Sequence, residues 1–349
     1  ASELGITVDQ LRTSVAEART KLYEARGKRV PPGLDDKALT SWNALALKAF
    51  AECGAAMDRK DWVEAARKNA DFLLRELVKD GRLQRTWKAG SSPNPVGGDA
   101  GPGEHRPSAT APAHSGIAKQ NAFLEDHAFL ADALLTLYEA TFEPRWLAEA
   151  KRIADEMVRH FWSENDGVFF DTPGDHENLI VRPRDIFDNA TPCGGSAAAM
   201  ALLRLAVFTG DTAYEQKAVS SLRAVRDYLP ASPQGFANWL CALDFHLAKR
   251  QEVVIIGAPD DPATQALAAT ARRDYAPNRV IAGASGPVAH EASSLIAVPG
   301  GPGPAAGGQR SPLLEGRGLV NGKPAAYVCE RYVCQMPVTD PAALAAQLR

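Results

Sequence analysis

Acidic side chains recur at the starts of apolar segments of this sequence, and they are the groups best suited to catalysis. Asp35 and Asp36 precede the first such segment, Glu125 and Asp126 open the second, and Asp188 precedes the third. Paired carboxylates in one cleft can process a glycoside, because one acid protonates the leaving oxygen while another activates water or attacks. Short carboxylates also cap helices by accepting bonds from first-turn N–H groups. Both interpretations stay open, a shared pocket and separate caps.

Polar and aromatic residues close to these carboxylates supply candidate substrate contacts. His127 follows the second acidic pair, and its ordinary pKa of ~6.5 would suit a general base. A histidine hydrogen-bonded within the pocket wall is the simpler interpretation. Aromatic rings at the same mouth could stack on sugar faces. The predicted catalytic residues are Asp36 and Asp126, then Asp35, Glu125 and Asp188, and the predicted substrate contacts are Trp42, Asn43, His127, Trp87, Asn189 and Trp239.

Histidines and cysteines give no pattern typical of a metal or cofactor site, and we expect neither. The seven histidines lack metal-ligand spacing, and the glycines of 300–308 lack the Lys-Ser/Thr of a phosphate-binding loop. Cys329 and Cys334 are separated by four residues, which is neither a redox Cys-x-x-Cys nor a usual zinc spacing. A redox role for this pair stays open. The other cysteines, predicted to be inert packing residues, are Cys53, Cys193 and Cys241.

Composition describes a globular chain with a sizeable core. It has 349 residues, 45% of them hydrophobic, a net charge of −3 and a pI near 6.2. This charge argues against nucleic acid or an anionic membrane as the main partner. No apolar run reaches the roughly 18 residues of a membrane span, and no signal peptide is recognisable. The odd number of cysteines, five, does not indicate a disulfide framework, so we expect a reducing cytoplasm.

Helical segments of two kinds alternate and would position the acidic residues. Residues 34–50 predict a helix that Asp35 or Asp36 caps and that is covered on most sides. An amphipathic helix over 61–79, an Asp80-Gly81 turn and a strand over 82–87 follow. The same series returns over 123–172, with an apolar helix predicted over 123–140 and an amphipathic one over 145–162. The offset is 88 residues between Leu39 and His127, and a third copy begins at Asp188. We interpret this as an internal repeat.

Alternating apolar and amphipathic helices predict hairpins arranged in a ring, whose apolar members form the inner wall. A helical solenoid shares the alternation, but the extended segments after each pair favour the ring. Residues 88–119 predict a long Gly/Pro-rich loop. Beyond about residue 250 a β-α-β pattern begins. The prediction is a mainly α, incomplete (α/α) toroid over 1–250 and a small α/β unit over 251–349.

Five motifs resemble the thioredoxin-domain-containing family related to spermatogenesis-associated proteins. They are LDDKALTSWN (34–43), LEDHAF (124–129), LYEATFEPRW (137–146), VRPRDIFDNATPCG (181–194) and AYVCERYVCQMPVTDP (326–341). Members of that family carry a thioredoxin-like domain followed by a six-hairpin (α/α) toroid similar to glycosidases and sugar epimerases. The resemblance implies that this chain is the C-terminal part of such a protein, with an upstream thioredoxin-like domain as partner.

The sequence departs from the family pattern at two places. The family usually has Tyr where His127 stands, and often Ser-Gly-Asn where Cys193-Gly194-Gly195 stand. Two functions follow from the sequence as a whole. The toroid could bind or process a small-molecule or glycan ligand, as a glycoside hydrolase-like or sugar epimerase-like enzyme. Alternatively, it could be a non-catalytic module that presents clients to the thioredoxin-like domain.

Overall fold

The computed structural model describes residues 1–30, 35–89, 116–175, 180–285 and 311–349. The chain divides into two compact units, Ala1–Lys37 and Ala38–Arg349. The first unit contains a 3-10 turn, η1 (Ser2–Leu4), and helix α1 (Val8–Gly27), whose start is closed by a capping box between Thr7 and Gln10. None of the residues of α1 is buried.

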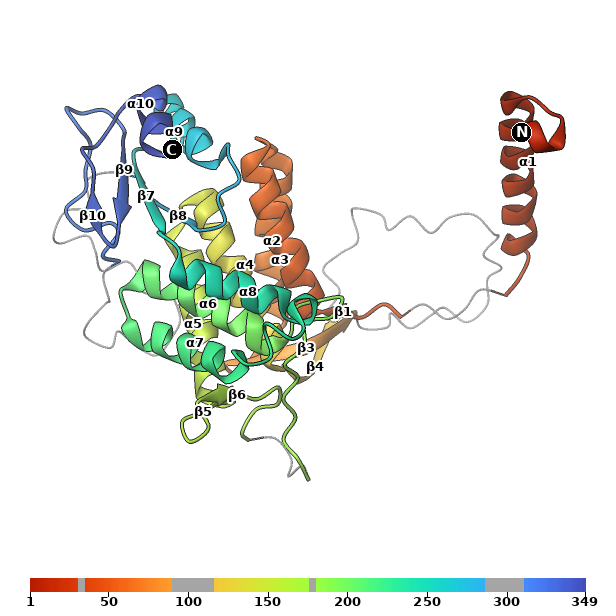
Figure 1. Cartoon of the computed structure of the whole chain (residues 1–349), viewed down its shortest axis with the longest axis horizontal. Helices are drawn as coiled ribbons and strands as arrows, with labels where there is room; N and C mark the ends of the chain where they lie inside the picture. Colours follow the sequence, from red (N-terminus) through yellow and green to blue (C-terminus); the bar gives the residue numbers. More distant parts are fainter. Residues whose placement is uncertain (31–34, 90–115, 176–179, 286–310) are drawn as a thin grey trace. The chain divides into compact units, whose positions relative to one another are not determined.

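Helical hairpins make up most of the second unit. Their helices are α2 (Thr40–Ala56), α3 (Lys60–Glu76), α4 (Leu124–Thr141), α5 (Pro144–Phe161), α6 (Gly194–Thr209), α7 (Thr212–Val225) and α8 (Ala237–Leu247), the last preceded by η2 (Pro233–Phe236). The inner helices α2, α4, α6 and α8 pack on one another in chain order (Figure 1). Each of α3, α5 and α7 packs on the inner helix that precedes it. The predicted fold class, hairpins forming part of an (α/α) toroid, is confirmed.

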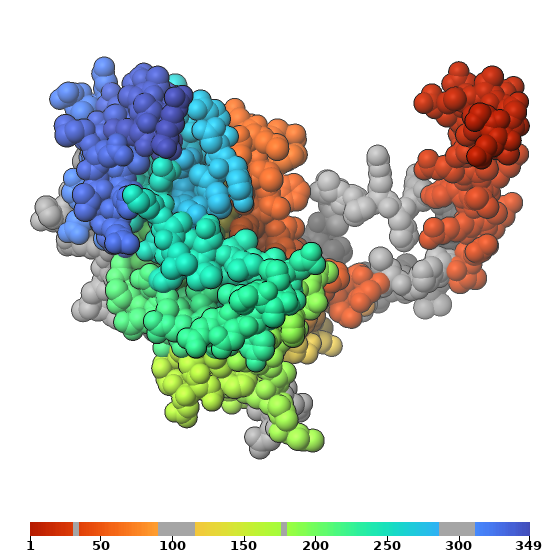
Figure 2. Space-filling view, viewed as in Figure 1, coloured from red at the N-terminus to blue at the C-terminus, as the bar shows by residue number. Residues whose placement is uncertain are grey.

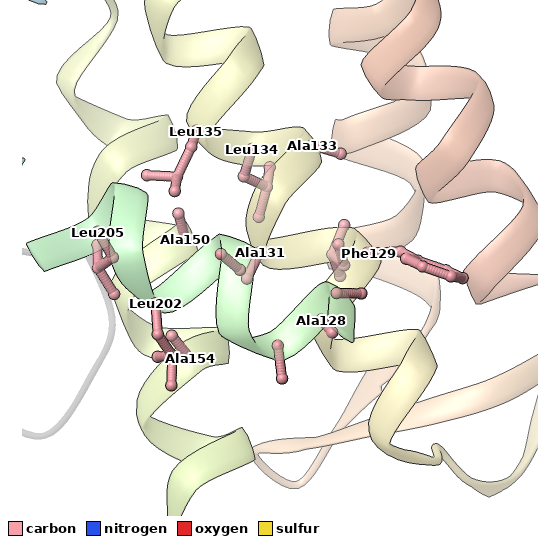
Figure 3. Close-up of a cluster of buried hydrophobic side chains, with 14 of the residues drawn as sticks. Ala128, Phe129, Ala131, Ala133, Leu134, Leu135, Ala150, Ala154, Leu202 and Leu205 are labelled. Atoms are coloured by element: carbon pink, nitrogen blue, oxygen red, sulfur yellow. The ribbon is translucent and has the colours of Figure 1, made fainter. Parts of the chain in front are cut away.

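The hairpin core forms because the inner helices are apolar on nearly every side. Alanines of α4 such as Ala128 and Ala131 let α5 and α6 approach closely, and leucines such as Leu134, Leu202 and Leu205 fill the space between them (Figure 3). Fully burying such a leucine contributes about 1.5–3 kcal/mol. The outer helix α5 buries one stripe, which includes Trp146, and keeps its charged side chains on the other side with the exception of the buried Glu156.

Helix α2 differs from its prediction in two respects. It begins at Thr40 with Leu39 at the N-cap and no side-chain cap, so the predicted capping by Asp35 or Asp36 is wrong. The reason is that residues Ala38–Leu39 form strand β1, which pairs with β3 and stands between Asp36 and the first turn of the helix. The helix is also not covered on most sides, because it is the first inner helix of the row. Trp42 is 68% exposed and Phe50 43%.

Short antiparallel strands follow the first two hairpins. Strand β2 (Val78–Lys79) turns at Asp80-Gly81, as predicted, into β3 (Arg82–Ala89), which also pairs with β4 (Gly116–Asn121). After the second hairpin, β5 (Trp162–Ser163) pairs with β6 (Val168–Phe169). The loop predicted over 88–119 is wrong at both ends, because its ends pair as strands; residues 90–115 lie outside the described residues, as do 300–308.

The predicted β-α-β pattern is present in the C-terminal part. Strand β7 (Gln251–Ile256), helix α9 (Pro262–Arg272) and parallel strand β8 (Arg279–Ala284) are joined by β9 (Ala325–Glu330), β10 (Val333–Cys334) and helix α10 (Pro341–Gln347), with strand order β10-β9-β7-β8. Val253 and Ile255 of β7 face α9 and α10, whereas Val254 and Ile256 face the helical core. The sheet thus lies directly on the hairpins. In Figure 2 the dark blue residues at the C-terminal end of the chain lie beside the green helices.

Cysteines depart from their predicted states. Cys329 and Cys334, treated above as a spaced thiol pair, are joined by a disulfide. Cys53 and Cys241, predicted to be packing residues, are exposed because they lie on partly open faces of α2 and α8. Cys193 is buried, and burial raises the pKa of its thiol to about 11. Within the described ranges no helix is long and apolar enough to cross a membrane.

Candidate functional site

Asp126 joins the starts of two inner helices. Its buried carboxylate accepts a hydrogen bond from the Ser41 N–H of α2 at 3.0 Å and one from the Phe123 N–H at the start of α4 at 2.9 Å. Arg85 donates to the same carboxylate at 3.0 Å. Burial raises the pKa of Asp126, and the Arg85 charge opposes that rise. The side chain that caps α2 therefore comes from α4, and not from Asp35 or Asp36.

Asp188 joins the other two inner helices in the same way. One carboxylate oxygen accepts from the Cys193 N–H at 2.9 Å and from the Ser196 hydroxyl at 2.6 Å, at the start of α6. The other oxygen accepts from the N–H groups of Asn238 and Trp239, at 2.9 and 3.3 Å, at the start of α8. Both oxygens are fully engaged, so this geometry suits helix capping better than proton transfer.

A cavity of about 260 Å³ lies at the starts of α4 and α6. Its lining residues are Phe123, Glu125, Asp171, Asp185, Phe187, Asn189, Thr191, Pro192, Cys193 and Gly194. Three carboxylates thus meet in one hollow from three separate segments. Two of the predicted residues, Glu125 and Asn189, are among the lining residues. Asp171 was not predicted as a site residue. Its only sequence cue was its place near the end of the series 123–172.

Asp171 and Glu125 differ in their electrostatic surroundings. Burial raises the pKa of Asp171 to about 6, the negative charges of Asp185 and Glu125 add to the rise, and the Asp185 N–H, 2.6 Å from its carboxylate, opposes it. Glu125 instead accepts a hydrogen bond from Arg85 at 2.9 Å, and the side chain of Glu125 is 33% exposed. Two carboxyls with such different partners can divide the roles of acid and base.

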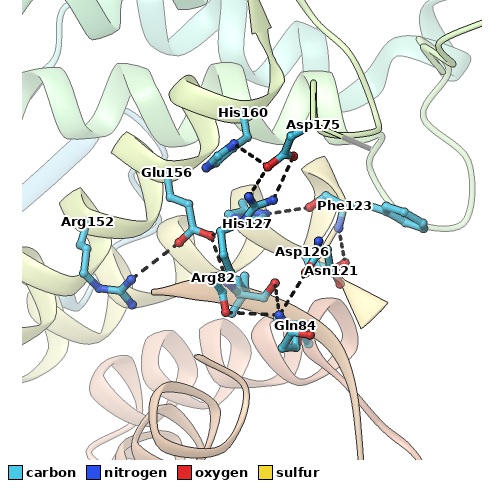
Figure 4. Close-up of polar contacts among 12 residues, drawn as sticks. Arg82, Gln84, Asn121, Phe123, Asp126, His127, Arg152, Glu156, His160 and Asp175 are labelled. Carbon is cyan, nitrogen blue, oxygen red and sulfur yellow. Dashed lines mark hydrogen bonds and ion pairs between the residues drawn. The ribbon is translucent and has the colours of Figure 1, made fainter. Parts of the chain in front are cut away.

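His127 occupies the wall of the site. Its Nδ1 donates to the Phe123 carbonyl at 2.9 Å, and its Nε2 lies 3.3 Å from the Glu156 carboxylate (Figure 4). Glu156 also accepts from the Leu83 N–H at 3.0 Å, which connects α5 to β3. His127 is only 2% exposed. This placement favours the structural interpretation of the histidine over a general base.

The other predicted substrate contacts are not among the lining residues of this cavity. Trp42 is exposed on α2, and the side chain of Asn43 donates to the Leu39 carbonyl at 2.9 Å. Trp87 packs edge-on against Phe72, and Trp239 is buried and donates to the Ile186 carbonyl at 3.0 Å. Asp35 and Asp36 are exposed and belong to Ala1–Lys37, where Asp35 pairs with Lys37 at 3.1 Å.

A larger cavity of about 620 Å³ lies between the inner helices and the segment after α9. Pro192 lines both cavities, so they are neighbours. Asp132 in its wall accepts from Lys48 at 2.6 Å and pairs with Arg204, which also pairs with Glu139. The charges of Lys48, Asp132, Arg204 and Glu139 are thus paired in this wall, whereas Arg272 donates to backbone carbonyls. Over the residues that the structure covers, no cluster of three or more His, Cys, Asp or Glu could hold a metal ion.

Sequence comparison identifies relatives that are longer than this chain. It is 31% identical to mouse spermatogenesis-associated protein 20 over 352 residues, and 31% identical to the human protein of that name over 347 residues, with 99% of this chain and 40% of each relative covered. An uncharacterized protein of Caenorhabditis elegans is 28% identical, with 95% and 40% covered. The chain is therefore homologous to spermatogenesis-associated protein 20 and spans about 40% of its length. No family model matches.

Solved structures with similar folds are distant in sequence. A GH76 α-mannanase of Bacteroides thetaiotaomicron aligns with 70% of this chain and 58% of its own, at 15% identity and a TM-score of 0.43. An unsaturated glucuronyl hydrolase of Bacillus sp. GL1, responsible for the degradation of glycosaminoglycan, aligns with 63% and 62%, also at 15% identity and a TM-score of 0.43. Alignments at this level do not define corresponding residues.

Proposed function

We propose that the cavity at the starts of α4 and α6 binds a carbohydrate and that its carboxylates act on it as acid and base. The observation that carries the proposal is the contrast between Asp171 and Glu125. Asp171, with its pKa raised to about 6, holds a proton up to nearly neutral pH, whereas Glu125 is paired with Arg85. Glycoside cleavage needs one protonated and one ionised carboxyl at the same bond.

Five of the ten lining residues have a stated role in this proposal. Asp171 protonates the departing oxygen, and Glu125 activates water or attacks the sugar carbon. Asp185 positions Asp171 through its backbone N–H. Asn189 offers an amide to sugar hydroxyls, and Phe187, which is 48% exposed, offers an aromatic face. The cavity is smaller than the roughly 300–1,000 Å³ typical of drug-sized ligands, so we expect it to hold a single sugar residue.

A second function uses the same cavity without catalysis. In it the toroid is a binding module that presents clients to an upstream thioredoxin-like domain. The observation that favours it is the engagement of Asp126 and Asp188 in helix capping. In each of these predicted catalytic acids, both carboxylate oxygens already accept hydrogen bonds from backbone N–H groups. This function needs binding in the cavity but no proton transfer from Asp171.

The test separates binding from turnover. The purified chain is screened against neutral, amino and acidic sugars by thermal shift, since a ligand that binds only the folded state raises the melting temperature. Sugars that bind are then incubated with the chain and followed by NMR. We expect Asp171→Asn to keep binding but to lose turnover by about 10²–10⁴-fold, the usual contribution of a general acid. The matched control is Asp166→Asn, on an exposed turn.

Three outcomes are distinguishable in this experiment. Binding with turnover that depends on Asp171 and Glu125 supports the enzyme. Binding by the wild-type chain without turnover supports the non-catalytic module. If no sugar shifts the melting temperature, the carbohydrate proposal is wrong for both functions.

A further inference from the structure

The hairpin β9–β10 carries a disulfide that neither cavity uses. Cys329 and Cys334 lie directly opposite each other in the antiparallel register, with their Cα atoms 3.9 Å apart. The turn between the strands is formed by Arg331 and Tyr332, with φ of 50° and 66°. The two sulfur atoms differ in access, because Cys329 is 3% exposed whereas Cys334 is an exposed residue. An external thiolate can therefore approach Cys334 much more readily than Cys329.

A buried arginine faces both sulfur atoms. The Arg317 side chain is 8% exposed, and its Nη2 lies 2.9 Å from the Cys334 Sγ and 3.4 Å from the Cys329 Sγ. Its Nη1 donates to backbone carbonyls, including that of Pro312 at 2.8 Å. Within the described ranges, the charges of Glu252 and Glu315 act on this guanidinium but neither carboxylate forms an ion pair with it, and its Nε has no hydrogen-bond partner. The nearest acceptors of Nη2 are therefore sulfur atoms.

This arrangement matches a thiolate better than a disulfide. A disulfide sulfur is a weak and neutral acceptor, so Nη2 has no ionic partner in direct contact, although the charges of Glu252 and Glu315 act on the guanidinium. A thiolate in the same place would form a charge-assisted pair with Nη2, as cationic neighbours do in reactive cysteine sites. Because Arg317 favours the reduced state in this way, the pair should be more readily reduced than an ordinary structural disulfide.

The hairpin does not depend on the disulfide to stay in place. The Tyr332 N–H donates to the Glu252 carboxylate at 2.7 Å, and its hydroxyl donates to the Val207 carbonyl of α6 at 3.1 Å. Strand β9 pairs along its length with β7. A cross-link over so short a loop also constrains the unfolded chain less than a longer one does. A purely structural role for this bond is therefore weakly supported.

We propose that Cys329, Cys334 and Arg317 form a redox-active site that exchanges two electrons with a thiol reductant. The reductant's thiolate attacks the Cys334 Sγ, which forms a mixed disulfide and breaks the Cys329–Cys334 bond. The electron pair leaves on the Cys329 Sγ as a thiolate beside Arg317 Nη2. A second thiol then attacks the mixed disulfide, releases Cys334, which takes up a proton, and leaves the reductant as a disulfide. The site is independent of the carbohydrate proposal.

The first test is a redox titration with glutathione. The chain carries Cys53→Ser and Cys241→Ser, so that the exposed free cysteines do not interfere. The fraction reduced is measured by alkylation and mass spectrometry over a range of reduced to oxidised glutathione. We expect reduction within this range, and we expect Arg317→Gln to disfavour it about tenfold, which corresponds to ~30 mV for two electrons. Arg317→Lys keeps the charge and should restore most of that difference.

The second test does not require Arg317→Gln to fold. In Cys334→Ser the remaining Cys329 thiol should ionise below its ordinary pKa of ~8.5, as read from the pH dependence of its alkylation rate, because its sulfur contacts Arg317. The carboxylate of Glu252, which lies opposite Cys329 in the β7–β9 register, opposes this shift. In Cys329→Ser the exposed Cys334 should form a mixed disulfide with glutathione faster than Cys329 does in Cys334→Ser. A disulfide that stays oxidised across the whole glutathione range would overturn the proposal. So would a Cys329 thiol that ionises at or above the ordinary pKa.

Discussion

Replacement of Asp171 by Asn tests the electrostatics of the cavity without any knowledge of the ligand. The pKa of this carboxyl rises from 3.8 to about 6 on folding, chiefly because it is buried. Two pKa units correspond to at most about 3 kcal/mol, at ~1.36 kcal/mol per unit. Because the residue is only half-buried, solvent screens part of this effect, and we expect about 1–2 kcal/mol. Asn keeps an oxygen that can accept from the Asp185 N–H.

The sign of this effect depends on pH. Below about pH 3.8 the carboxyl is protonated in both the folded and the unfolded chain, and its raised pKa has no effect on stability. As the pH rises through 4 to 6 the unfolded chain releases the proton more readily, so wild-type stability falls, and the full cost is present above about pH 7. Asp171→Asn removes this cost. The gain in the free energy of unfolding of Asp171→Asn over wild type should therefore be larger at pH 8 than at pH 4 by about 1–2 kcal/mol.

Urea unfolding at the two pH values measures this difference, because the linear extrapolation gives the free energy of unfolding in each case. Asp166→Asn, on the exposed turn before β6, is the matched control and should show no such pH dependence. If the stability difference between Asp171→Asn and wild type is the same at pH 4 and pH 8, the carboxyl is not perturbed. The assignment of Asp171 as the acid would then be refuted.

Three further predictions concern charged side chains that connect neighbouring helices, and each is measured by urea unfolding at pH 7. Asp126→Ala should lower the free energy of unfolding by about 3–5 kcal/mol, because two helix-start N–H groups lose their buried acceptor and Arg85 keeps only Glu125 as its carboxylate partner. A loss below about 1 kcal/mol would contradict this role. Arg204→Met should lower the free energy of unfolding by about 3–5 kcal/mol, because the buried carboxylates of Asp132 and Glu139 lose their shared cation. Lys48→Met, at the more exposed edge of the same network, should cost under about 1 kcal/mol. Equal costs for the two substitutions would argue against this network. Asp188→Ala should cost about 2–4 kcal/mol, since four hydrogen bonds at two helix starts are lost, and Asp188→Asn should recover part of it.

Most of the fold could be predicted from helical periodicity in the sequence. The apolar series of 123–140 and the amphipathic series of 145–162 predicted α4 and α5 to within a residue or two, because burial on one or all sides leaves a direct pattern in the sequence. The alternation of such helices was enough to predict packed hairpins. The extended pairing of residues 116–121 was not predictable, because a strand held by backbone bonds to β3 needs no hydrophobic alternation of its own.

The candidate site was less predictable than the fold, since its partners are distant in sequence. The pattern around Asp36 indicated a local cap, but the acceptor for the Ser41 N–H comes from Asp126, 85 residues later. The sequence does not indicate which way an aromatic side chain near a helix start points. Trp42 is exposed and Trp239 is buried, although both were predicted to contact a substrate. Asp171 is a lone carboxylate in a short connecting segment, and only the folded chain places it beside Glu125 and Asp185.

Acids at helix starts in this toroid divide into two classes with different partners. Asp126 and Asp188 each hold two inner helices together, and that use requires both carboxylate oxygens to point at backbone N–H groups. Such a carboxylate cannot also turn toward a ligand without releasing a helix, so capping and catalysis compete for the same oxygens. Glu125 stands beside Asp126 in sequence but accepts from a side chain, Arg85, at the surface of the cavity. It can therefore exchange partners with a ligand at a much smaller cost in stability. The acid adjacent to the cap, rather than the cap itself, is accordingly the residue whose replacement should alter ligand chemistry while sparing the fold.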